Sequence, residues 1–264
     1  MAKVNPGEML PQERQQWILD RLRQRGRVVA VELAAEFVVS EDSVRRDLRE
    51  LAAQGLCKRV YGGALPLSAA VAPLKQRRQE HAGRKLALAR KAVTLVRQGQ
   101  VLLIDAGSTN AAIAAALPAD FGLTVVTNAP DIAQTLLERE GFEILLIGGR
   151  IDVRIGAAVG AQAVQEIQRV RADLCFPGAC AVDADGGLWG FDSEEALLKR
   201  AMVEAGGETV VVATSDKLGT VATHRVAGID EVQHLVVEHD VSRALRASFS
   251  AQGLVVHRAD PAAA

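Results

Sequence analysis

Several short polar segments in the second half of the chain carry side chains that could bind an anion. Each follows an apolar run, and together they comprise Asp105–Asn110, Thr127–Asn128, Gly148–Arg150, Gly178–Asp183, Glu194–Lys199 and Ser215–Lys217. In the first of them, Gly107 allows close backbone approach, and the hydroxyls and free N–H groups of a helix start suit a phosphate. A Gly-Ser-Thr run alone is as often only a turn and a helix cap. The succession of these segments predicts one shared pocket for a phosphorylated ligand.

A second group with chemical potential lies between residues 40 and 61, where arginines are mixed with hydroxyl groups. Arginine can read guanine through two hydrogen bonds, and serine or arginine can hold a phosphate. The alternative is a solvated basic face on a small helical domain. The combination of residue types and spacing predicts contacts with double-stranded DNA through Ser40, Ser43, Arg45, Arg46, Arg49, Lys58, Arg59 and Tyr61.

The segment that would present these arginines has the pattern of a small helical domain. Helices are predicted at 11–25, 31–37 and 41–54. Ser40 caps the third helix, and Val44, Leu48 and Leu51 form its buried stripe. A short strand and a Gly-Gly turn follow. This order predicts a helix-turn-helix with a β-wing, whose third helix enters the major groove.

From residue 100 onward, apolar runs alternate with helical patterns. Strands are predicted at 101–104, 123–126, 143–147, 173–176, 210–213 and 235–238, and helices at 108–117, 131–137, 161–170 and 194–205. This alternation predicts an α/β domain with a largely parallel sheet, in which ligands bind at the carboxyl ends of the strands. The phosphate-binding loop of nucleotide-binding proteins and the Gly-x-Gly-x-x-Gly fingerprint are both missing, which disfavours nucleotide binding.

Charge is unevenly distributed along the 264 residues. Residues 1–99 hold 19 basic and 10 acidic side chains, whereas residues 100–264 hold 12 basic and 22 acidic ones, so that the net charge is only −1. A basic N-terminal third favours a nucleic-acid-binding module. Nine residues are aromatic, too few for single-strand recognition by base stacking.

Most of the N-terminal positive charge lies in a connecting segment. Residues 66–73 have the composition of a linker, and Leu74 to Arg97 are predicted to be mostly helical, with a break or bend near Gly83. This helix could attract DNA at long range, or it could be a solvated helix that packs on the acidic domain. The predicted domains are therefore 11–66 for DNA binding, 67–99 as linker and connecting helix, and 100–258 for ligand sensing.

The three cysteines, Cys57, Cys175 and Cys180, have no metal-like spacing. They are expected to be free thiols of a cytoplasmic protein. The N-terminal residues lack an apolar signal core, and no run of about 18 apolar residues exists, so no membrane association is expected.

The third helix and the wing closely resemble the DeoR family of bacterial transcription regulators. The resemblance rests on Val39-Ser40-Glu41-Asp42-Ser43-Val44-Arg45-Arg46-Asp47-Leu48, on Gly55-Leu56 and on Arg59-Val60-Tyr61-Gly62-Gly63-Ala64. Ser43 stands where the family usually has threonine, and both carry a hydroxyl. We expect Asp47 to orient the neighbouring arginines by ion pairing.

The second half resembles the sensor domain of the same family, whose fold is similar to ribose-5-phosphate isomerase. The resemblance implies a DNA-binding regulator, usually a repressor of a sugar or carbohydrate catabolic operon, whose DNA affinity is changed by a phosphorylated sugar. It implies a homo-oligomer (dimer or tetramer) without cofactor, metal or catalytic residues. Departures from the family pattern are Asn110, Pro177, Trp189 and the run Val236-Val237-Glu238-His239. The implied effector-binding residues are Asp105, Gly107, Ser108, Thr109, Thr127, Asn128, Gly148, Asp183, Glu195 and Lys217.

The competing hypothesis is a sugar-phosphate isomerase-like enzyme. Asp183 and Glu195, with Lys199 or Lys217, could act as its acid–base groups. The same side chains could equally hydrogen-bond a ligand or form surface ion pairs. An attached helix-turn-helix makes catalysis the minor hypothesis.

Overall fold

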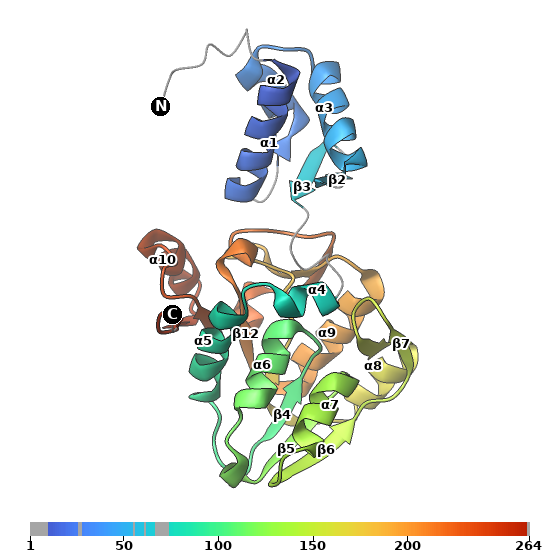
Figure 1. The fold of residues 1–264 in the computed structure, drawn as a ribbon, viewed down its shortest axis with the longest axis vertical. Helices are drawn as coiled ribbons and strands as arrows, with labels where there is room; N and C mark the ends of the chain where they lie inside the picture. The colour runs from blue at the N-terminus through green and yellow to red at the C-terminus, as the bar shows by residue number, and fades with distance from the viewer. Residues whose placement is uncertain (1–9, 26–27, 55, 61, 67–73, 263–264) are drawn as a thin grey trace.

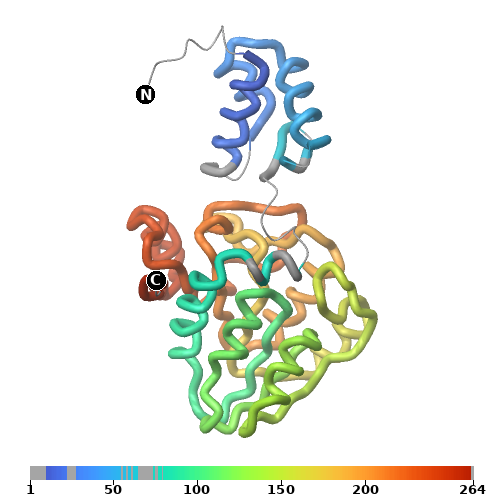
Figure 2. The backbone as a smooth tube through the Cα atoms, viewed as in Figure 1, coloured from blue at the N-terminus to red at the C-terminus, as the bar shows by residue number. Residues whose placement is uncertain are grey.

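The computed structural model describes residues 10–25, 28–54, 56–60, 62–66 and 74–262. The described residues form separate hydrophobic cores before and after the segment 67–73. Figures 1 and 2 trace the two units in blue and in green to red. We call residues 10–66 the DNA-binding domain and residues 74–262 the sensor domain, after the functions that the sequence predicts. The domain boundaries at 66, 99 and 258 stay predictions.

The DNA-binding domain has the predicted helices and a small antiparallel sheet. Its elements are α1 (Pro11–Arg25), β1 (Val28–Val29), α2 (Ala30–Phe37), α3 (Glu41–Ala53), β2 (Cys57–Val60) and β3 (Gly63–Pro66). The strand order is β1-β3-β2. A Cβ at Gly63 would lie 1.9 Å from the Val28 carbonyl oxygen, so that only glycine allows β1 to pair here. Val44, Leu48 and Leu51 of α3 are buried as predicted.

The turn between α2 and α3 stores backbone strain. Val38 ends α2 with φ 56° and ψ 44°, in the left-handed region. A β-branched residue is rarely found there, because its side chain crowds the backbone. The Val39 amide donates to the Ala34 carbonyl at 3.1 Å and closes the helix end. The geometry of the helix-turn-helix thus overrides the preference of the residue.

The sensor domain is built on a seven-stranded sheet of order β15-β14-β12-β9-β4-β5-β6. Every adjacent pair in it is parallel, which confirms the predicted parallel sheet. The central strands are apolar because helices cover both faces. The strands are β4 (Val101–Ile104), β5 (Leu123–Thr127), β6 (Phe142–Leu146), β9 (Ala172–Phe176), β12 (Gly206–Val212), β14 (His234–Val237) and β15 (Val255–Arg258).

Helices on both sides of this sheet complete the core. Figure 1 shows α6 and α7 in front of the sheet and α9 behind it. The helices are α4 (Leu74–Gln79), α5 (Ala82–Val93), α6 (Ser108–Ala116), α7 (Pro130–Leu137), α8 (Ala161–Ile167), α9 (Ser193–Ala205) and α10 (Arg243–Ala251). Short 3₁₀ helices in the described part of this domain are η3 (Ala119–Phe121), η4 (Ser215–Lys217) and η5 (Ile229–Glu231). None of the described helices is long and apolar enough to cross a bilayer.

Two small antiparallel units also belong to the sensor domain, and the sequence pattern did not predict them. One is a hairpin of β7 (Arg150–Asp152) and β8 (Ala157–Val159). The other is a three-stranded sheet of β10 (Ala181–Asp183), β11 (Gly187–Gly190) and β13 (His224–Ala227). Their strands have at most four residues, which is too short for a clear alternation of polar and apolar residues.

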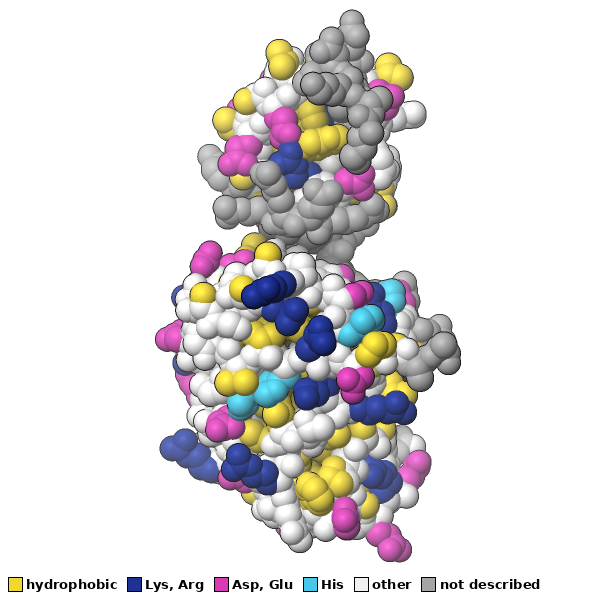
Figure 3. Space-filling view, turned by 90° about the vertical axis from the view of Figure 1, so that its left-hand side faces the viewer, with side chains coloured by type: hydrophobic (Ala, Val, Ile, Leu, Met, Phe, Trp, Pro, Cys, Tyr) yellow, Lys and Arg dark blue, Asp and Glu magenta, His cyan; other side chains and the backbone are white. Residues whose placement is uncertain are grey.

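The connecting helix is divided earlier than predicted. His81, with φ 54°, separates α4 from α5, two residues before Gly83. Leu88, Ala89 and Ala92 of α5 are fully buried in the sensor core. Figure 3 presents the face covered by α5 and α10, where Lys and Arg side chains are interspersed with Asp and Glu.

Candidate DNA-binding surface and ligand pocket

The N-terminus of α3 is built around two hydroxyl groups. The Ser43 amide donates to Ser40 Oγ at 3.2 Å, and the two Oγ atoms lie 2.9 Å apart. Glu41 and Asp42 occupy the first turn, where the helix dipole favours negative charge. Ser40 therefore has a structural task as N-cap, and any contact of Ser43 with DNA must share its hydroxyl with this cap.

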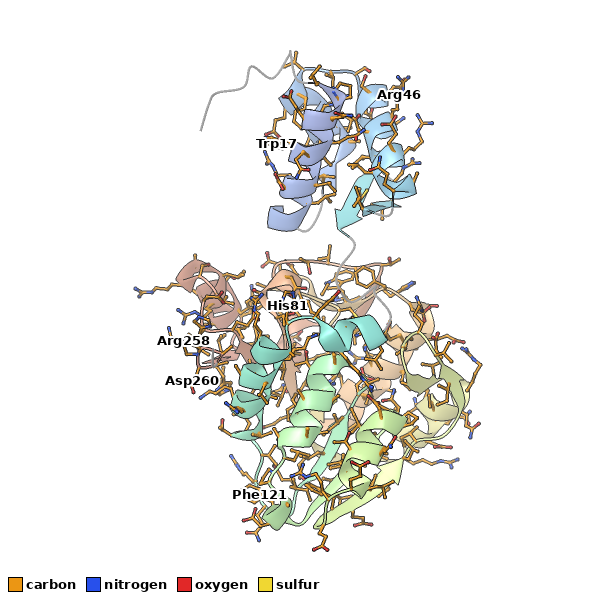
Figure 4. The ribbon with its side chains drawn as sticks, viewed as in Figure 1. Trp17, Arg46, His81, Phe121, Arg258 and Asp260 are labelled. Atoms are coloured by element: carbon orange, nitrogen blue, oxygen red, sulfur yellow. The ribbon has the colours of Figure 1, made fainter. Side chains whose placement is uncertain are left out.

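The three arginines of α3 are exposed. They lie away from the stripe of Val44, Leu48 and Leu51, because residues at other helical phases face solvent. Arg45 makes an ion pair with Glu41 at 2.6 Å on its own helix, and its side chain is 53% exposed. Figure 4 shows Arg46 on the outer side of α3, away from α1. Arg49 is exposed on the same helix. An exposed pair of this kind contributes little energy, so Arg45 can exchange Glu41 for a phosphate.

Asp47 does not orient these arginines, contrary to the expectation from the sequence. Its side chain is 3% exposed, and it accepts hydrogen bonds from Arg14 Nε at 2.5 Å and Arg14 Nη2 at 3.1 Å. Arg14 lies on α1, 33 residues away. The carboxylate points inward because it follows Val44 by three residues and shares the buried face. It therefore fixes α3 to α1.

The wing is formed by β2 and β3, which pair antiparallel from Cys57–Pro66 to Val60–Gly63. Arg59 is exposed on β2. Gly62 has φ 79°, a conformation that glycine adopts at little cost. Tyr61 and the side chain of Lys58 lie outside the described part of the structure.

A pocket opens where several strands of the sensor sheet end, and the space in and in front of it, open solvent included, is about 380 Å³. Of the predicted ligand-binding residues, Gly107, Ser108, Thr109, Glu195 and Lys217 line it. The additional lining residues are Arg77, Ala106, Asn110, Ile155, Gly178, Ala179, Cys180, Lys199 and Val212. Residues from seven parts of the chain therefore meet here.

The first turn of α6 forms one wall of the pocket. Gly107, with φ 148°, turns the chain from β4 into α6. The first amides of a helix have no intrahelical acceptor, so they can bind an anion. Asn110, a departure from the family pattern, donates its amide to the carbonyl oxygens of Asp105 and Phe176, each at 2.9 Å. That side chain joins α6 to the ends of β4 and β9.

Three charged side chains meet next to this wall, of which Asp105 and Lys199 are buried and Glu195 is partly exposed. Lys199 Nζ is 2.6 Å from Asp105 Oδ2 and 2.8 Å from Glu195 Oε1, and the Lys199 side chain is 2% exposed. Burial disfavours the charged form of Lys199, but the two carboxylates outweigh burial and raise its pKa. The amides of Ala106 and Gly178 also donate to Asp105, each at 2.8 Å. We call Asp105, Glu195 and Lys199 the buried triad.

Lys217 is a cation of a different kind, because its ammonium group makes no hydrogen bond or ion pair with any residue that the structure describes. Burial lowers the pKa of Lys217, and the positive charges of Arg77 and Lys199 lower it further, while Cys180 and Asp216 act in the opposite direction. Burial also raises the pKa of the adjacent Cys180 thiol, with help from Glu195, to about 11. An anion in the pocket would compensate the charge of Lys217.

The remaining predicted residues lie outside the lining. Asn128 Nδ2 donates to Asp105 Oδ1 at 3.2 Å and supports the buried triad from below. The Thr127 hydroxyl donates to the Ile104 carbonyl at 2.6 Å and accepts the Ala129 amide. Gly148 donates its amide to Glu166, and Asp183 accepts the amide of Gly186 in the turn after β10. The structure does not bring Gly148 and Asp183 to the pocket.

Arg77, Gly178 and Cys180 also belong to the pocket. Gly178 and Cys180 lie in a segment from which the sequence predicts the pocket, although they are not among the implied effector-binding residues, whereas Arg77 lies outside every such segment. A Cβ at Gly178 would lie 2.7 Å from Asp105 Oδ2 and 2.8 Å from Lys199 Nζ, which explains the glycine. Lys199 lies in another predicted pocket segment and is also a candidate acid–base group, and its spacing of four from Glu195 on a predicted helix indicates the pair. Arg77 gave no signal. Within the described residues, no three His, Cys, Asp or Glu side chains form a metal site, and the three cysteines are free.

Comparison with known proteins agrees with this arrangement. Residues 14–69 match the DeoR-like helix-turn-helix domain, and residues 80–239 match the DeoR C-terminal sensor domain. The chain is 36% identical over 221 residues to the glycerol-3-phosphate regulon repressor of Escherichia coli K12, covering 83% of this chain and 88% of that protein. It is 31% identical to the putative aga operon transcriptional repressor of Escherichia coli O157:H7, covering 87% of each chain.

One of the similar solved structures is ribose 5-phosphate isomerase A from Methanocaldococcus jannaschii. The identity is 17%, the TM-score is 0.37, and the match covers 52% of this chain and 55% of that one. The relatives above bear the names of regulators, which favours the regulator over the isomerase-like enzyme. With both of the family's domains present, this chain belongs to the DeoR family of transcriptional regulators.

Proposed function

We propose that this protein represses a carbohydrate catabolic operon and releases its operator when a phosphorylated sugar or polyol occupies the sensor pocket. Ser43, Arg45, Arg46 and Arg49 read the major groove, while Ser40 caps α3. Lys58, Arg59 and Tyr61 of the wing bind neighbouring phosphates or the minor groove. The names of the relatives, a glycerol-3-phosphate regulon repressor and a putative aga operon repressor, support repression and a carbohydrate ligand.

The ligand proposal rests on one observation: Lys217 and the first turn of α6 line the same pocket. Lys217 supplies a cation that makes no hydrogen bond or ion pair within the described part of the chain, and the first turn supplies the N–H groups and hydroxyls that a phosphate accepts from. Glu195 lies in the same lining and can accept hydrogen bonds from sugar hydroxyls. The two carboxylates of the buried triad neutralise the charge of Lys199, so that Lys199 stabilises these carboxylates instead of binding the ligand.

Binding of the ligand changes DNA affinity only if the ligand prefers one of two states of the protein. We propose that the ligand favours the state with low DNA affinity. We also propose that the protein acts as a dimer or tetramer, because helix-turn-helix proteins usually read two half-sites related by a two-fold axis.

DNA binding is tested by titrating the full chain with a duplex from upstream of its own gene at several salt concentrations. Affinity is expected to fall steeply with salt, because phosphate contacts release counterions. A duplex of equal length from a coding region serves as the control for specificity. Equal affinity for both duplexes at every salt concentration would exclude the proposed operator recognition.

Ligand binding is tested by thermal unfolding with inorganic phosphate, glycerol 3-phosphate, ribose 5-phosphate and glucose 6-phosphate. Glycerol, ribose and glucose are the unphosphorylated controls. At least one phosphorylated compound is expected to raise Tm by mass action. Lys217→Met should abolish the rise, whereas Lys91→Met, a change of the same type on α5 outside the pocket lining, should not. If no phosphorylated compound shifts the wild-type protein, the proposed ligand class is wrong.

A further inference from the structure

We infer that α4, the element that directly follows the segment after the DNA-binding domain, is itself a wall of the ligand pocket. Arg77 of α4 binds the anionic group of the ligand opposite Lys217, so that pocket occupancy is linked to the position of α4. This inference rests on the proposed phosphate pocket. It adds a ligand-binding residue on the connecting segment and a route from the ligand to the DNA-binding domain.

The placement of Arg77 is the first argument. Arg77 lines the same pocket as Gly107, Ser108 and Lys217, although it lies 31 residues before the start of α6 at Ser108. Figure 1 shows α4 crossing above α6, at the end where α6 begins. The guanidinium therefore reaches the site from a different element than the other cation. Two cations on separate elements can hold one phosphate between them, and arginine can do so through two hydrogen bonds.

The second argument is that contacts with neighbouring elements hold α4 at both of its ends. At its start, the Leu74 amide donates to the Arg154 carbonyl at 3.3 Å, and the buried Leu74 side chain fills the space next to Gly156. A Cβ at Gly156 would lie 2.4 Å from Leu74 Cδ2. At its end, Lys85 Nζ of α5 donates to the carbonyl oxygens of Arg77 and Glu80. The pocket wall is thus an ordered helix, held by the β7–β8 hairpin and by α5.

The third argument is electrostatic. Burial lowers the pKa of Lys85, and the charges of Lys217 and Arg77 lower it further, while Glu80 and Asp216 oppose this. Lys217 is subject to the charge of Arg77 in the same way. Three like charges therefore crowd the junction of α4, α5 and η4. A bound anion would relieve their repulsion, and it would hold α4 more firmly than the empty pocket does.

Arg84 of α5 joins that helix to η4, the element that carries Lys217, through a separate contact. Its guanidinium donates to Ser215 Oγ at 2.8 Å and to Glu238 at 2.5 Å, and Ser215 is the first residue of η4, which carries Lys217. The Ser215 amide donates to the same Glu238 carboxylate at 2.8 Å. Because α5 contacts both α4 and η4, a ligand that draws Arg77 and Lys217 together acts on one connected unit.

The link to the DNA-binding domain follows from chain length. Pro66 ends the wing and Leu74 begins α4. A chain of this length spans at most roughly 28 Å when fully extended. The position and orientation of α4 therefore limit where the wing and α3 can lie relative to the sensor domain. A ligand that fixes α4 restricts the placements from which two half-sites can be read.

The first experiment measures binding of inorganic phosphate and of the three phosphorylated panel compounds to the full chain by calorimetry. Arg77→Gln is expected to weaken binding about tenfold, as expected for loss of a charged hydrogen bond. The matched control is Arg78→Gln, the neighbouring arginine, which pairs with Asp131 and does not line the pocket. It should stay within about twofold of wild type. Equal affinities of the Arg77→Gln variant and the wild type would overturn the inference.

The second experiment measures the ratio of operator affinities without and with each panel compound at saturation. The wild type and the Arg78→Gln variant should show the same ratio, and the Arg77→Gln variant a smaller one. A full ratio in the Arg77→Gln variant would overturn the link through α4. Failure of the proposed function gives a different result, because the wild-type protein itself would then bind none of the panel compounds. Loss of binding in the Lys217→Met variant only would keep the pocket and reject the role of Arg77.

Discussion

The DNA-binding domain exposes its functional cations, whereas the sensor domain buries most of the charge around its pocket. The Arg45 side chain is 53% exposed and pairs with Glu41 one turn away. The Lys199 side chain is 2% exposed and is held by Asp105 and Glu195. An exposed pair can be exchanged for a nucleic-acid phosphate at little cost, but a buried pair cannot be separated without a large penalty.

This difference distinguishes positive side chains that can bind an anion from positive side chains that stabilise the fold. Lys199 is neutralised by two carboxylates, so the attraction for an anion comes from Lys217, Arg77 and the first turn of α6. The DNA-binding domain has a supporting pair of its own, Arg14 with Asp47. In the DNA-binding domain burial distinguishes the two uses, and in the sensor domain the carboxylate partners of Lys199 distinguish it from Lys217.

The buried triad should show the largest effect. Asp105→Ala removes the closest partner of Lys199 and the acceptor of two backbone amides, and is expected to destabilise the sensor domain by about 4 kcal/mol. Urea unfolding in a Trp17→Phe background, which leaves Trp189 as the fluorescent reporter, measures it. The control is the exposed Asp120→Ala, expected within about 0.5 kcal/mol of wild type. If Asp105→Ala lowers the free energy of unfolding by no more than Asp120→Ala does, the buried triad contributes no more to stability than an exposed carboxylate.

The buried pair of the DNA-binding domain should come next. Arg14→Ala leaves Asp47 without its arginine and is expected to cost about 3 kcal/mol. The same unfolding measurement in a Trp189→Phe background reports this domain through Trp17. Arg49→Ala on α3 is the exposed control. If Arg14→Ala and Arg49→Ala have equal effects on unfolding, the contrast between buried and exposed arginines does not hold within this domain.

The exposed arginines should affect DNA binding instead of stability. Arg45→Ala together with Arg46→Ala is expected to weaken operator binding by at least about 2 kcal/mol, because each contact contributes about 1 kcal/mol or more. Unfolding of the domain should change by less than about 0.5 kcal/mol. Arg90→Ala with Arg97→Ala removes the same charge from exposed positions of the connecting segment. Equal losses in the two double variants would mean that total charge, not placement on α3, governs affinity.

The turn between α2 and α3 should show the smallest effect, and one of opposite sign. Val38→Gly removes the crowding of a β-branched side chain at φ 56° and is expected to stabilise the DNA-binding domain by about 1 kcal/mol. Thermal unfolding measures the gain as a rise in Tm. Val39→Gly, outside the left-handed region, should lower Tm instead. A lower Tm for Val38→Gly would show that the loss of backbone entropy exceeds the relief of strain.

Local patterns in the sequence determined the elements and several of the residues that begin them. The apolar spacing of Val44, Leu48 and Leu51 and the cap at Ser40 are sufficient for α3, because helix formation depends on neighbours within one or two turns. The apolar strands followed by glycine and hydroxyl residues likewise predicted the parallel sheet and the wall at Gly107 and Ser108, because ligands of such sheets meet the carboxyl ends of strands.

Only the tertiary structure decided which charges meet. Asp47 pairs with Arg14, which is 33 residues away in the chain, and Lys199 pairs with Asp105, which is 94 residues away. Such pairs depend on how the helices and strands pack. Gly148 and Asp183 follow strands as the pocket residues do, yet they lie elsewhere, because β6 is the edge strand and β10 belongs to a separate small sheet. Arg77 reaches the pocket because contacts with the β7–β8 hairpin and with α5 hold α4 in place. A side chain's own sequence neighbourhood cannot reveal burial or partnership that distant elements create.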